Sequence, residues 1–312
     1  MKNYEVSARS LYDTTDVSHD TFNDPEVAHL EIHHNMVLGS HLVPGLEADI
    51  EELENGIRMN LRVLEGVRIA RPVHLCFGMI PETGVQEIYM NVHIGKNAGV
   101  SIMAHCTFPN AVDVVHRMEA DITVDENAEY AYFERHVHGS TGGIQVVPRA
   151  RVTLEKGARF KTEFELLRGR VGAIEIDYET TCKEDSVMEM DARINGTHDD
   201  SIKIRETGHL VGAGARGVLT SRIAVRNNAQ AEVYNKITAT APYARGHVDC
   251  KEIVQDRGVA TAIPIVEVRD PRAHVTHEAA IGSVDTRQLE TLMSRGLSED
   301  DAVELIIQGL LS

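Results

Sequence analysis

The chain has 312 residues, 42% of them hydrophobic, so it can bury the core of one large domain or of one domain with a small appendage. Its formal net charge of −17 argues against nucleic acid and anionic membrane surfaces as partners, because both would repel it. No apolar run approaches the roughly 18 residues that a membrane span requires. The N-terminal sequence MKNYEVSARSLYDTTDVSHD lacks the apolar core of a signal peptide, so we expect a cytoplasmic protein.

Three segments follow one another along the chain. Residues 1–55 are polar and rich in histidine, and we expect them to be partly helical; LEADIEELE at 46–54 fits either a short helix or an edge strand. Residues 56–276 carry a repeat of strand character, and we assign them to a β-helix core. Residues 277–312 carry helix signals and form the third segment.

The repeat consists of two alternating apolar stretches that flank a polar turn and a small residue. The turns centre on Ala98, Ala128, Ala158, Ser186, Ala215, Ala229 and Val259. Their spacing is about 30 residues with one half-step of about 14, which is typical of a solenoid. We expect coils of about 15 residues, stacked as a parallel β-helix. The alternative is a β-sandwich, which also has many short strands but needs no constant spacing.

Several histidines and one cysteine lie in the early repeats. His105 and Cys106 precede His136 and His138 by about one 30-residue period, and His116 lies between them. This pattern fits a metal site on one face, although such histidines are more often surface groups or structural ones. The other early and middle cysteines, at positions 76 and 182, fit core positions. No Cys-x-x-Cys pair occurs, so the sequence predicts neither a zinc knuckle nor a dithiol redox motif. In a reducing cytoplasm we expect the thiols to be free.

The sequence ARGHVDCKEIV at 244–254 brings a thiol together with imidazole and carboxylate groups. In a strand, Cys250 and Glu252 share one face, and His247 reaches that face only through a turn or bulge. A thiolate is a strong ligand for iron, and a positive neighbour such as Lys251 would lower its pKa. Alternatively, Cys250 is a small buried hydrophobic residue.

His277 and Glu278 begin the motif HEA near the end of the repeat. They follow Cys250 by about 28 residues, or two coils of the expected length, which would place them about 10 Å from the thiol. One iron ion cannot span that gap, whereas a multi-iron cluster or ligands from two chains can. The alternative is a pair of solvated polar residues at the end of the solenoid.

Two helices are predicted after the repeat. Asp285 with Gln288 and Ser298 with Asp301 are capping signals, and Gly296 is a natural end for the first helix. The second helix is apolar over more than the stripe that one packing surface needs. We therefore expect a partner to dock on this segment; the alternative is a helical cap on the solenoid. The expected docking residues are Leu292, Met293, Leu297, Val303, Ile306, Ile307 and Leu310.

The RGHVDC motif, the later HEA motif and the terminal LMSRGLSEDDAVELII resemble, in order and spacing, the C-terminal core of the SufB/SufD family. These proteins are scaffold subunits of an iron–sulfur cluster assembly machine. The resemblance implies a right-handed parallel β-helix with small helical ends. It also implies that Cys250 is the scaffold cysteine for a transient iron–sulfur cluster, with His277 or Glu278 completing its ligation and Glu252 and His247 as further candidates.

The resemblance implies partners as well. The chain has the thiol, the histidine and the glutamate together, so it resembles SufB-type more than SufD-type chains, as a homodimer or as half of a heterodimer. An ABC-type ATPase (SufC-like) would bind the C-terminal helices, and a sulfur donor and apoprotein acceptors would complete the system. The chain has no GxxxxGK[ST] phosphate loop, so the ATPase activity would reside in that partner and this chain would be a non-catalytic scaffold. The alternative is a β-helix metalloenzyme, carbonic-anhydrase-like or carbohydrate-active, that uses a histidine cluster.

Overall fold

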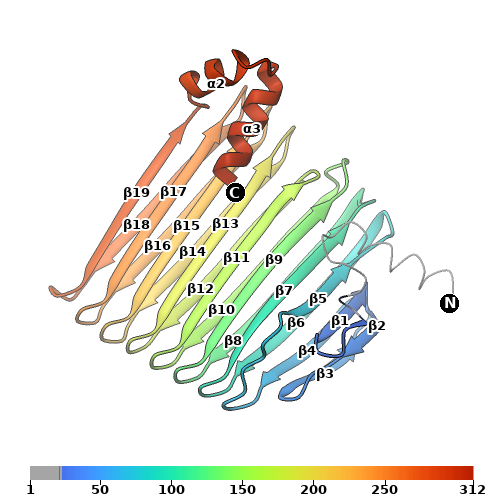
Figure 1. Cartoon of the computed structure of the whole chain (residues 1–312), viewed down its shortest axis with the longest axis vertical. Coiled ribbons are helices and arrows are strands. Elements are labelled where there is room, and N and C mark those ends of the chain that lie inside the picture. The colour runs from blue at the N-terminus through green and yellow to red at the C-terminus, as the bar shows by residue number, and fades with distance from the viewer. Residues whose placement is uncertain (1–20, 22, 312) are drawn as a thin grey trace.

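The computed structural model describes residue 21 and residues 23–311, most of which lie in the strands of two long sheets (Figure 1). The first sheet contains, in spatial order, β2 (Met36–His41), β1 (His29–His33), β5 (Val73–Gly78), β7 (Gly99–Phe108), β9 (Glu129–His138), β11 (Arg159–Arg168), β13 (Val187–Gly196), β15 (Arg216–Val225), β17 (Arg245–Val254) and β19 (His274–Gly282). The second sheet contains β3 (Leu46–Glu52), β4 (Gly56–Val63), β6 (Thr83–Ile94), β8 (Asp113–Val124), β10 (Ile144–Leu154), β12 (Ala173–Cys182), β14 (Ser201–Leu210), β16 (Gln230–Ala239) and β18 (Val259–Val268).

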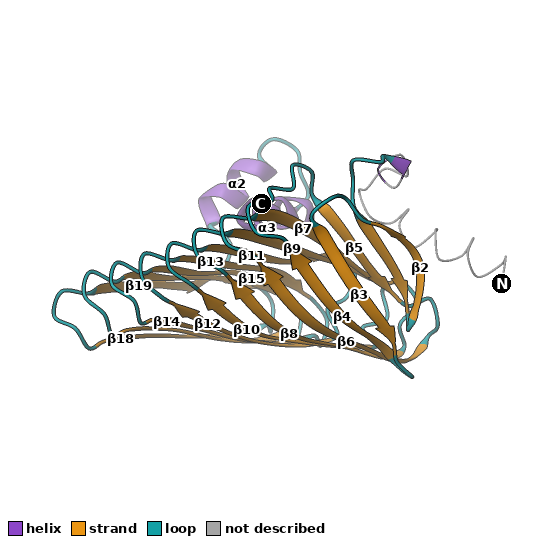
Figure 2. Cartoon of the chain, turned by 90° about the horizontal axis from the view of Figure 1, so that it is seen from below, coloured by secondary structure: helices purple, strands orange, loops and turns teal. Residues whose placement is uncertain are grey.

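From β4 onward the chain alternates between the two sheets, and neighbouring strands within each sheet are parallel. The sheets face each other across one continuous apolar core, and Figure 2 shows them as two layers. Inward-facing side chains alternate with outward-facing ones along each strand, as the period-two sequence pattern requires. The predicted parallel β-helix is confirmed.

Each coil consists of one strand from each sheet, so the predicted coil of 15 residues is wrong. In β7 and β9, Gly99 pairs with Glu129, a full 30-residue period away. In β17 and β19, Val248 pairs with His277. Both corners of a coil carry the same turn signature, so the sequence pattern does not distinguish half a coil from a full coil.

The corners explain why the repeat is visible in the sequence. Asn97, Asn127 and Asp185, which precede first-sheet strands, have φ values of 58°, 56° and 54°. Asn227 and Asp256, which precede second-sheet strands, have φ values of 59° and 57°. This left-handed conformation is costly for most residues, but Asn and Asp tolerate it because their short side chains bond to nearby backbone.

The N-terminal end of the solenoid is closed by antiparallel strands. Within residues 1–55, the described part contains β1, β2 and β3, and residues 1–20 lie outside it. β2 pairs antiparallel with β1, and β3 pairs antiparallel with β4. Of residues 46–54, which fit a short helix or an edge strand, residues 46–52 therefore form an edge strand.

The C-terminal segment forms the two predicted helices, α2 (Thr286–Met293) and α3 (Glu299–Leu311). The Asp285 carboxylate accepts a hydrogen bond from the Gln288 backbone N–H at 2.8 Å, and the Ser298 hydroxyl accepts one from the Asp301 N–H at 3.2 Å. Gly296 has a φ of 97° in the turn between the helices. Both capping predictions are confirmed, because the side chains satisfy backbone N–H groups that have no partner within the helix.

The second helix lies over the first sheet (Figure 2). Ile307 and Leu311 are buried in a small apolar cluster with Ala224 at the end of β15. Arg226 donates a hydrogen bond to Glu304 at 2.7 Å and fixes the helix beside the same strand. No helix in the described ranges is long and apolar enough to cross a membrane.

Candidate functional site

Strand β17 places the candidate thiol on the inner face of the solenoid. Cys250 and Glu252 are buried, with 0% and 3% of their surface exposed, whereas His247, Asp249 and Lys251 are partly exposed. This alternation confirms that the thiol and the carboxylate of Glu252 share a face. It also places His247 on the opposite face, because no bulge interrupts the pairing of β17 with its neighbours.

Polar groups from neighbouring strands surround the inner pair. The Asn235 side-chain amide lies 3.9 Å from the Cys250 sulfur. Ser221 lies on β15, where it pairs with Cys250 of β17. Its hydroxyl donates a hydrogen bond to Glu252 at 3.3 Å. The other carboxylate oxygen of Glu252 has no hydrogen-bond partner among the described residues, so it is available to a metal ion or a proton.

Burial dominates the electrostatics of this pair. Burial raises the pKa of the Cys250 thiol, which keeps it protonated, and the Ser221 hydroxyl opposes the shift only in part. Burial also raises the pKa of Glu252 to about 7. The expected lowering of the thiol pKa by a positive neighbour is therefore not found. Lys251 points to the outer face, where its ammonium group lies 3.2 Å from Asp249.

The remaining predicted ligands lie on different faces of the solenoid. His247 contacts the Thr276 hydroxyl on the outside at 2.8 Å. His277 pairs with the inward-facing Val248, and Glu278 pairs with the outward-facing Asp249. His277 and Glu278 are thus one coil from Cys250, about 5 Å along the solenoid, rather than two. Cys250, Glu252 and His277 have inward positions, whereas His247 and Glu278 have outward ones.

His277 is exposed because it belongs to the last coil. Strands β18 and β19 are the edge strands of their sheets. Among the described residues, none packs fully over their inner faces, so every side chain on these two strands is at least partly exposed. Apolar side chains are exposed here, with Val259 at 54%, Val268 at 45% and Ile281 at 47%. An open solenoid end with unpaired backbone and exposed apolar groups is a ready surface for another chain.

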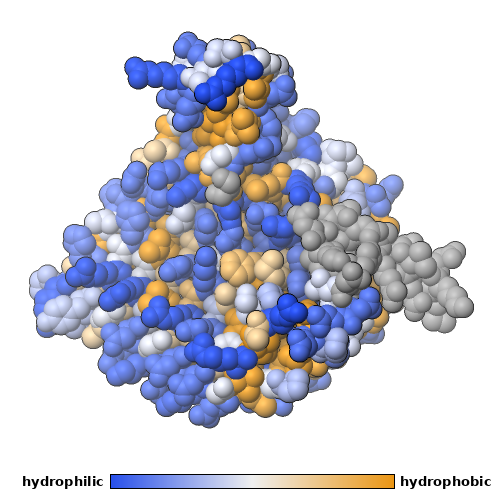
Figure 3. All heavy atoms as spheres, in the orientation of Figure 1, coloured by the Kyte–Doolittle hydropathy of each residue, from blue (hydrophilic) through white to orange (hydrophobic). Residues whose placement is uncertain are grey.

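The predicted docking residues differ in their accessibility. Ile307 is buried against the protein's own β15 and is not available to a partner. Met293 is 42% exposed, and Leu305, which was not predicted, is 47% exposed. Figure 3 shows apolar surface beside these helices. The other predicted docking residues are half-buried: Leu292, Leu297, Val303, Ile306 and Leu310.

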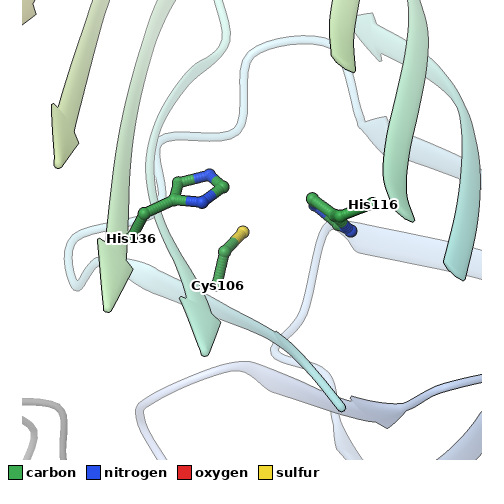
Figure 4. Close-up of side chains that lie close together, drawn as sticks. All are labelled: Cys106, His116 and His136. Atoms are coloured by element: carbon green, nitrogen blue, oxygen red, sulfur yellow. The ribbon is translucent and has the colours of Figure 1, made fainter. Parts of the chain in front are cut away.

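A second cluster lies in the early coils. The structure brings together Cys106 of β7, His136 of β9 and His116 of β8, and Figure 4 shows their side chains pointing toward one another. One potential ligand atom from each lies within 4.8 Å of the others. All three residues are buried, at 0% to 1% exposed. Five strand steps separate β7 from β17, so the cluster is about 24 Å from Cys250.

Two buried acids inside the solenoid were missed in the sequence. Glu134 lies 2.6 Å from His136 through one carboxylate oxygen, and burial raises its pKa to about 7. Burial raises the pKa of Glu206 on β14 to about 8. The signal was present, because both acids occupy inward positions of the two-residue alternation, next to Tyr132 in β9 and Ile204 in β14.

The sequence of this chain matches a known family model. The family model described as "SUF system FeS cluster assembly, SufBD core domain" matches residues 82–310, which include Cys250 with its neighbours, the early-coil cluster, α2 and all of α3 but its last residue. This chain belongs to the SufBD family. The match covers most of the solenoid, so the parallel β-helix and the family assignment rest on the same residues.

Relatives cover most of the chain as well. The iron–sulfur cluster assembly SufBD family protein of Methanocaldococcus jannaschii is 37% identical over 267 residues, which is 86% of this chain and 84% of that protein. A SufBD family protein of Pyrococcus horikoshii is 35% identical over 285 residues, 91% of this chain and 87% of that protein. The SufB protein of Bacillus subtilis is 35% identical over a shorter stretch of 69 residues, 22% of this chain and 15% of that protein.

Proposed function

We propose that this SufBD family protein is a scaffold on which iron–sulfur clusters are built, with Cys250 as the central ligand. The observation that carries the proposal is a thiol and a buried carboxylate one coil beneath an exposed histidine, at the open end of the solenoid. Thiolate sulfur is the ligand that iron–sulfur clusters prefer, and imidazole and carboxylate groups complete the donor set.

A second copy of the scaffold would supply the missing ligands. One chain offers a single thiolate here, whereas a cluster usually has four protein ligands. Two chains joined at their open ends would bring together two copies each of Cys250, Glu252 and His277. Pairing at this end would also cover the free edges of β18 and β19 and the apolar groups beside them. We therefore favour a homodimer over a heterodimer, because this chain carries all three ligand types.

We further propose that an ABC-type ATPase docks on α2 and α3 through Met293, Leu305 and their half-buried neighbours. The second helix is tied to the strand beside β17, because Arg226 bonds to Glu304 and Ile307 packs on Ala224. A partner that moves this helix would therefore act on the structure one coil away from the thiol. Such coupling would give ATP hydrolysis a mechanical route to the cluster site.

The chemistry needs that opening. Burial keeps the Cys250 thiol protonated and raises the pKa of Glu252 to about 7, so the closed site resists oxidation and stray metal binding. Exposure to water would let Fe²⁺ displace the thiol proton, after which sulfide could bridge the iron ions at the seam. The assembled cluster is cargo and would pass to an apoprotein when the seam opens again.

Replacing the thiol tests the proposal. Cys250→Ser is expected to lose stable cluster reconstitution with Fe²⁺ and sulfide under anaerobic conditions, measured by visible absorbance and by iron content per chain. Cys182→Ser removes another buried thiol, far from the open end, and serves as the matched control that retains the cluster. Equal iron and sulfide content in the two variants, with both folded by circular dichroism, would contradict the role of Cys250.

The metalloenzyme alternative has a specific observation against it. Its histidine cluster would be that of His116 and His136, and both are 1% exposed inside the solenoid. A catalytic metal keeps an open ligand position that substrate can reach, whereas structural sites are closed. The closed position of this cluster favours the scaffold.

A further inference from the structure

The early-coil cluster has a donor set that the proposed scaffold chemistry does not use. Cys106 and His136 come from neighbouring strands of the first sheet, and His116 reaches across the interior from the second sheet. One thiol and two imidazoles converge on the space between them (Figure 4). This combination is typical of sites for Zn²⁺ or Fe²⁺, and it does not suit Mg²⁺ or Ca²⁺, which take oxygen ligands.

His116 is the strongest single indication that something binds here. Its imidazole is 1% exposed, and neither ring nitrogen has a hydrogen-bond partner among the described residues. Its ring contacts are with Phe108, at a centroid distance of 4.8 Å, and with His136, at 5.9 Å. A buried polar ring without partners destabilises the folded chain unless a further group satisfies it, and a metal ion beside Cys106 would do so.

His136 is held in the manner of a metal ligand. Its Nε2 lies 2.6 Å from a carboxylate oxygen of Glu134, and its Nδ1 lies 3.2 Å from the Nε2 of His138. His138 donates its own Nδ1–H to the Arg170 carbonyl at 2.9 Å, so its Nε2 carries a lone pair. Metal-binding histidines commonly donate their second ring N–H to a carboxylate, which fixes the ring. With its Nε2–H donated to Glu134, His136 keeps a lone pair on Nδ1 for the ion, and Glu134 is the positioning residue for His136. The lone pair of His138 Nε2 faces this Nδ1 at 3.2 Å, and an ion beside them would relieve the repulsion between the two nitrogens.

We infer that Cys106, His116 and His136 bind one divalent transition metal ion of the Zn²⁺ or Fe²⁺ class inside the early coils, apart from the cluster site at Cys250. The ion would join the two sheets, because its ligands come from β7 and β9 of the first sheet and from β8 of the second. At about 24 Å from Cys250 it cannot share ligands with the proposed cluster. Its role is therefore distinct from cluster assembly at the open end.

The protonation states of the free site fit this assignment. Burial lowers the pKa of His116 and of His136 to about 3, so both rings are neutral and can donate a lone pair. Burial raises the pKa of Cys106, so the thiol is protonated before binding. On binding, the S–H bond breaks and the sulfur keeps the electron pair to form the sulfur–metal bond. One proton leaves to solvent for each ion bound.

Cobalt(II) is the probe for this site, because tetrahedral Co²⁺–thiolate complexes absorb strongly in the near ultraviolet and the visible. The full-length chain is stripped with chelator and refolded without oxygen in the presence of Co²⁺, which gives the ion access to the interior. We expect one Co²⁺ per chain with thiolate charge-transfer absorption. The absorption should be lost in Cys106→Ser and retained in Cys182→Ser and Cys250→Ser.

A second variant guards against loss of folding. His116→Phe removes a ligand but keeps a ring beside Phe108, and it is expected to fold and to bind Co²⁺ at least tenfold more weakly than the parent chain. Zn²⁺ should raise the unfolding temperature of the parent chain and not that of this variant. The inference is overturned if His116→Phe binds Co²⁺ as tightly as the parent, if the parent binds none, or if the absorption disappears in Cys250→Ser instead.

Discussion

A glutamate buried in the middle of the solenoid should make the stability of this protein depend on pH. Glu206 is 2% exposed, and one of its carboxylate oxygens has no hydrogen-bond partner in the described part of the chain. Burial, with a smaller contribution from Asp191, raises its pKa from 4.5 to about 8. One pKa unit corresponds to about 1.4 kcal/mol, so the shift is equivalent to about 5 kcal/mol.

The sign follows from which state holds the proton. Between pH 4.5 and about 8 the folded chain keeps the Glu206 proton, whereas the unfolded chain has lost it. Stability is therefore fully present below pH 4.5 and falls as the pH rises, by up to about 1.4 kcal/mol per pH unit, until the pH passes the folded pKa. Glu206→Gln has no proton to lose, so its free energy of unfolding should decline less steeply.

Urea denaturation at several pH values between 5.5 and 8 measures this difference. Glu134 and Glu252 have raised pKa values as well, but they are common to both proteins and cancel in the comparison. Glu232→Gln, on the exposed face of the neighbouring β16, is the matched control and should leave the slope unchanged. Equal slopes for the parent chain and Glu206→Gln would refute the argument that burial keeps this acid protonated.

Two further predictions concern the helices and the corners. Met293→Glu combined with Leu305→Glu should abolish capture of the ABC-type ATPase in a pull-down without changing the circular dichroism spectrum. Val112→Glu, at an exposed position in a loop away from the helices, should leave capture intact. Unchanged capture by the double variant would place the docking site elsewhere. Asn127→Ala, at a φ of 56°, should lower the free energy of unfolding by about 1 kcal/mol, whereas Asn127→Gly should cost less, and a urea titration that ranks them in the opposite order would count against corner strain.

The corner residues explain which part of the fold could be predicted from the sequence. Asn97 and Asn127 lie one full coil apart, and each takes a left-handed conformation that few residues tolerate. The repeat of the coil is therefore visible in the sequence. The coil length was misjudged because Asn227 and Asp256 impose the same demand at the opposite corners. The residue type at a turn reflects the local backbone conformation and not the sheet to which the next strand belongs. The spacing of these residues alone therefore does not separate corners that lead into the first sheet from corners that lead into the second.

The candidate site was only partly readable for a related reason. Alternation along one strand put Cys250 and Glu252 together, since that relation is local. His116 comes to Cys106 from the opposite sheet, and its position depends on the lengths of the intervening corners. Glu134 has an inward position in the same alternation, but a charged residue is normally exposed, and the core environment that raises its pKa is set by residues far along the chain.

The two ends of the solenoid differ in a way that bears on the proposed pairing of two copies. At the N-terminal end, β2 and β3 reverse direction, and β3 exposes Glu47, Asp49 and Glu51 to any approaching strand. Among the described residues, the end formed by β18 and β19 is the one that is both parallel and apolar. Copies that met head to tail would bring an acidic, reversed edge against that end, and such contacts could extend into filaments. In the proposed dimer, contact between two like ends would cover both apolar surfaces at once, so a third copy would find no such end to join.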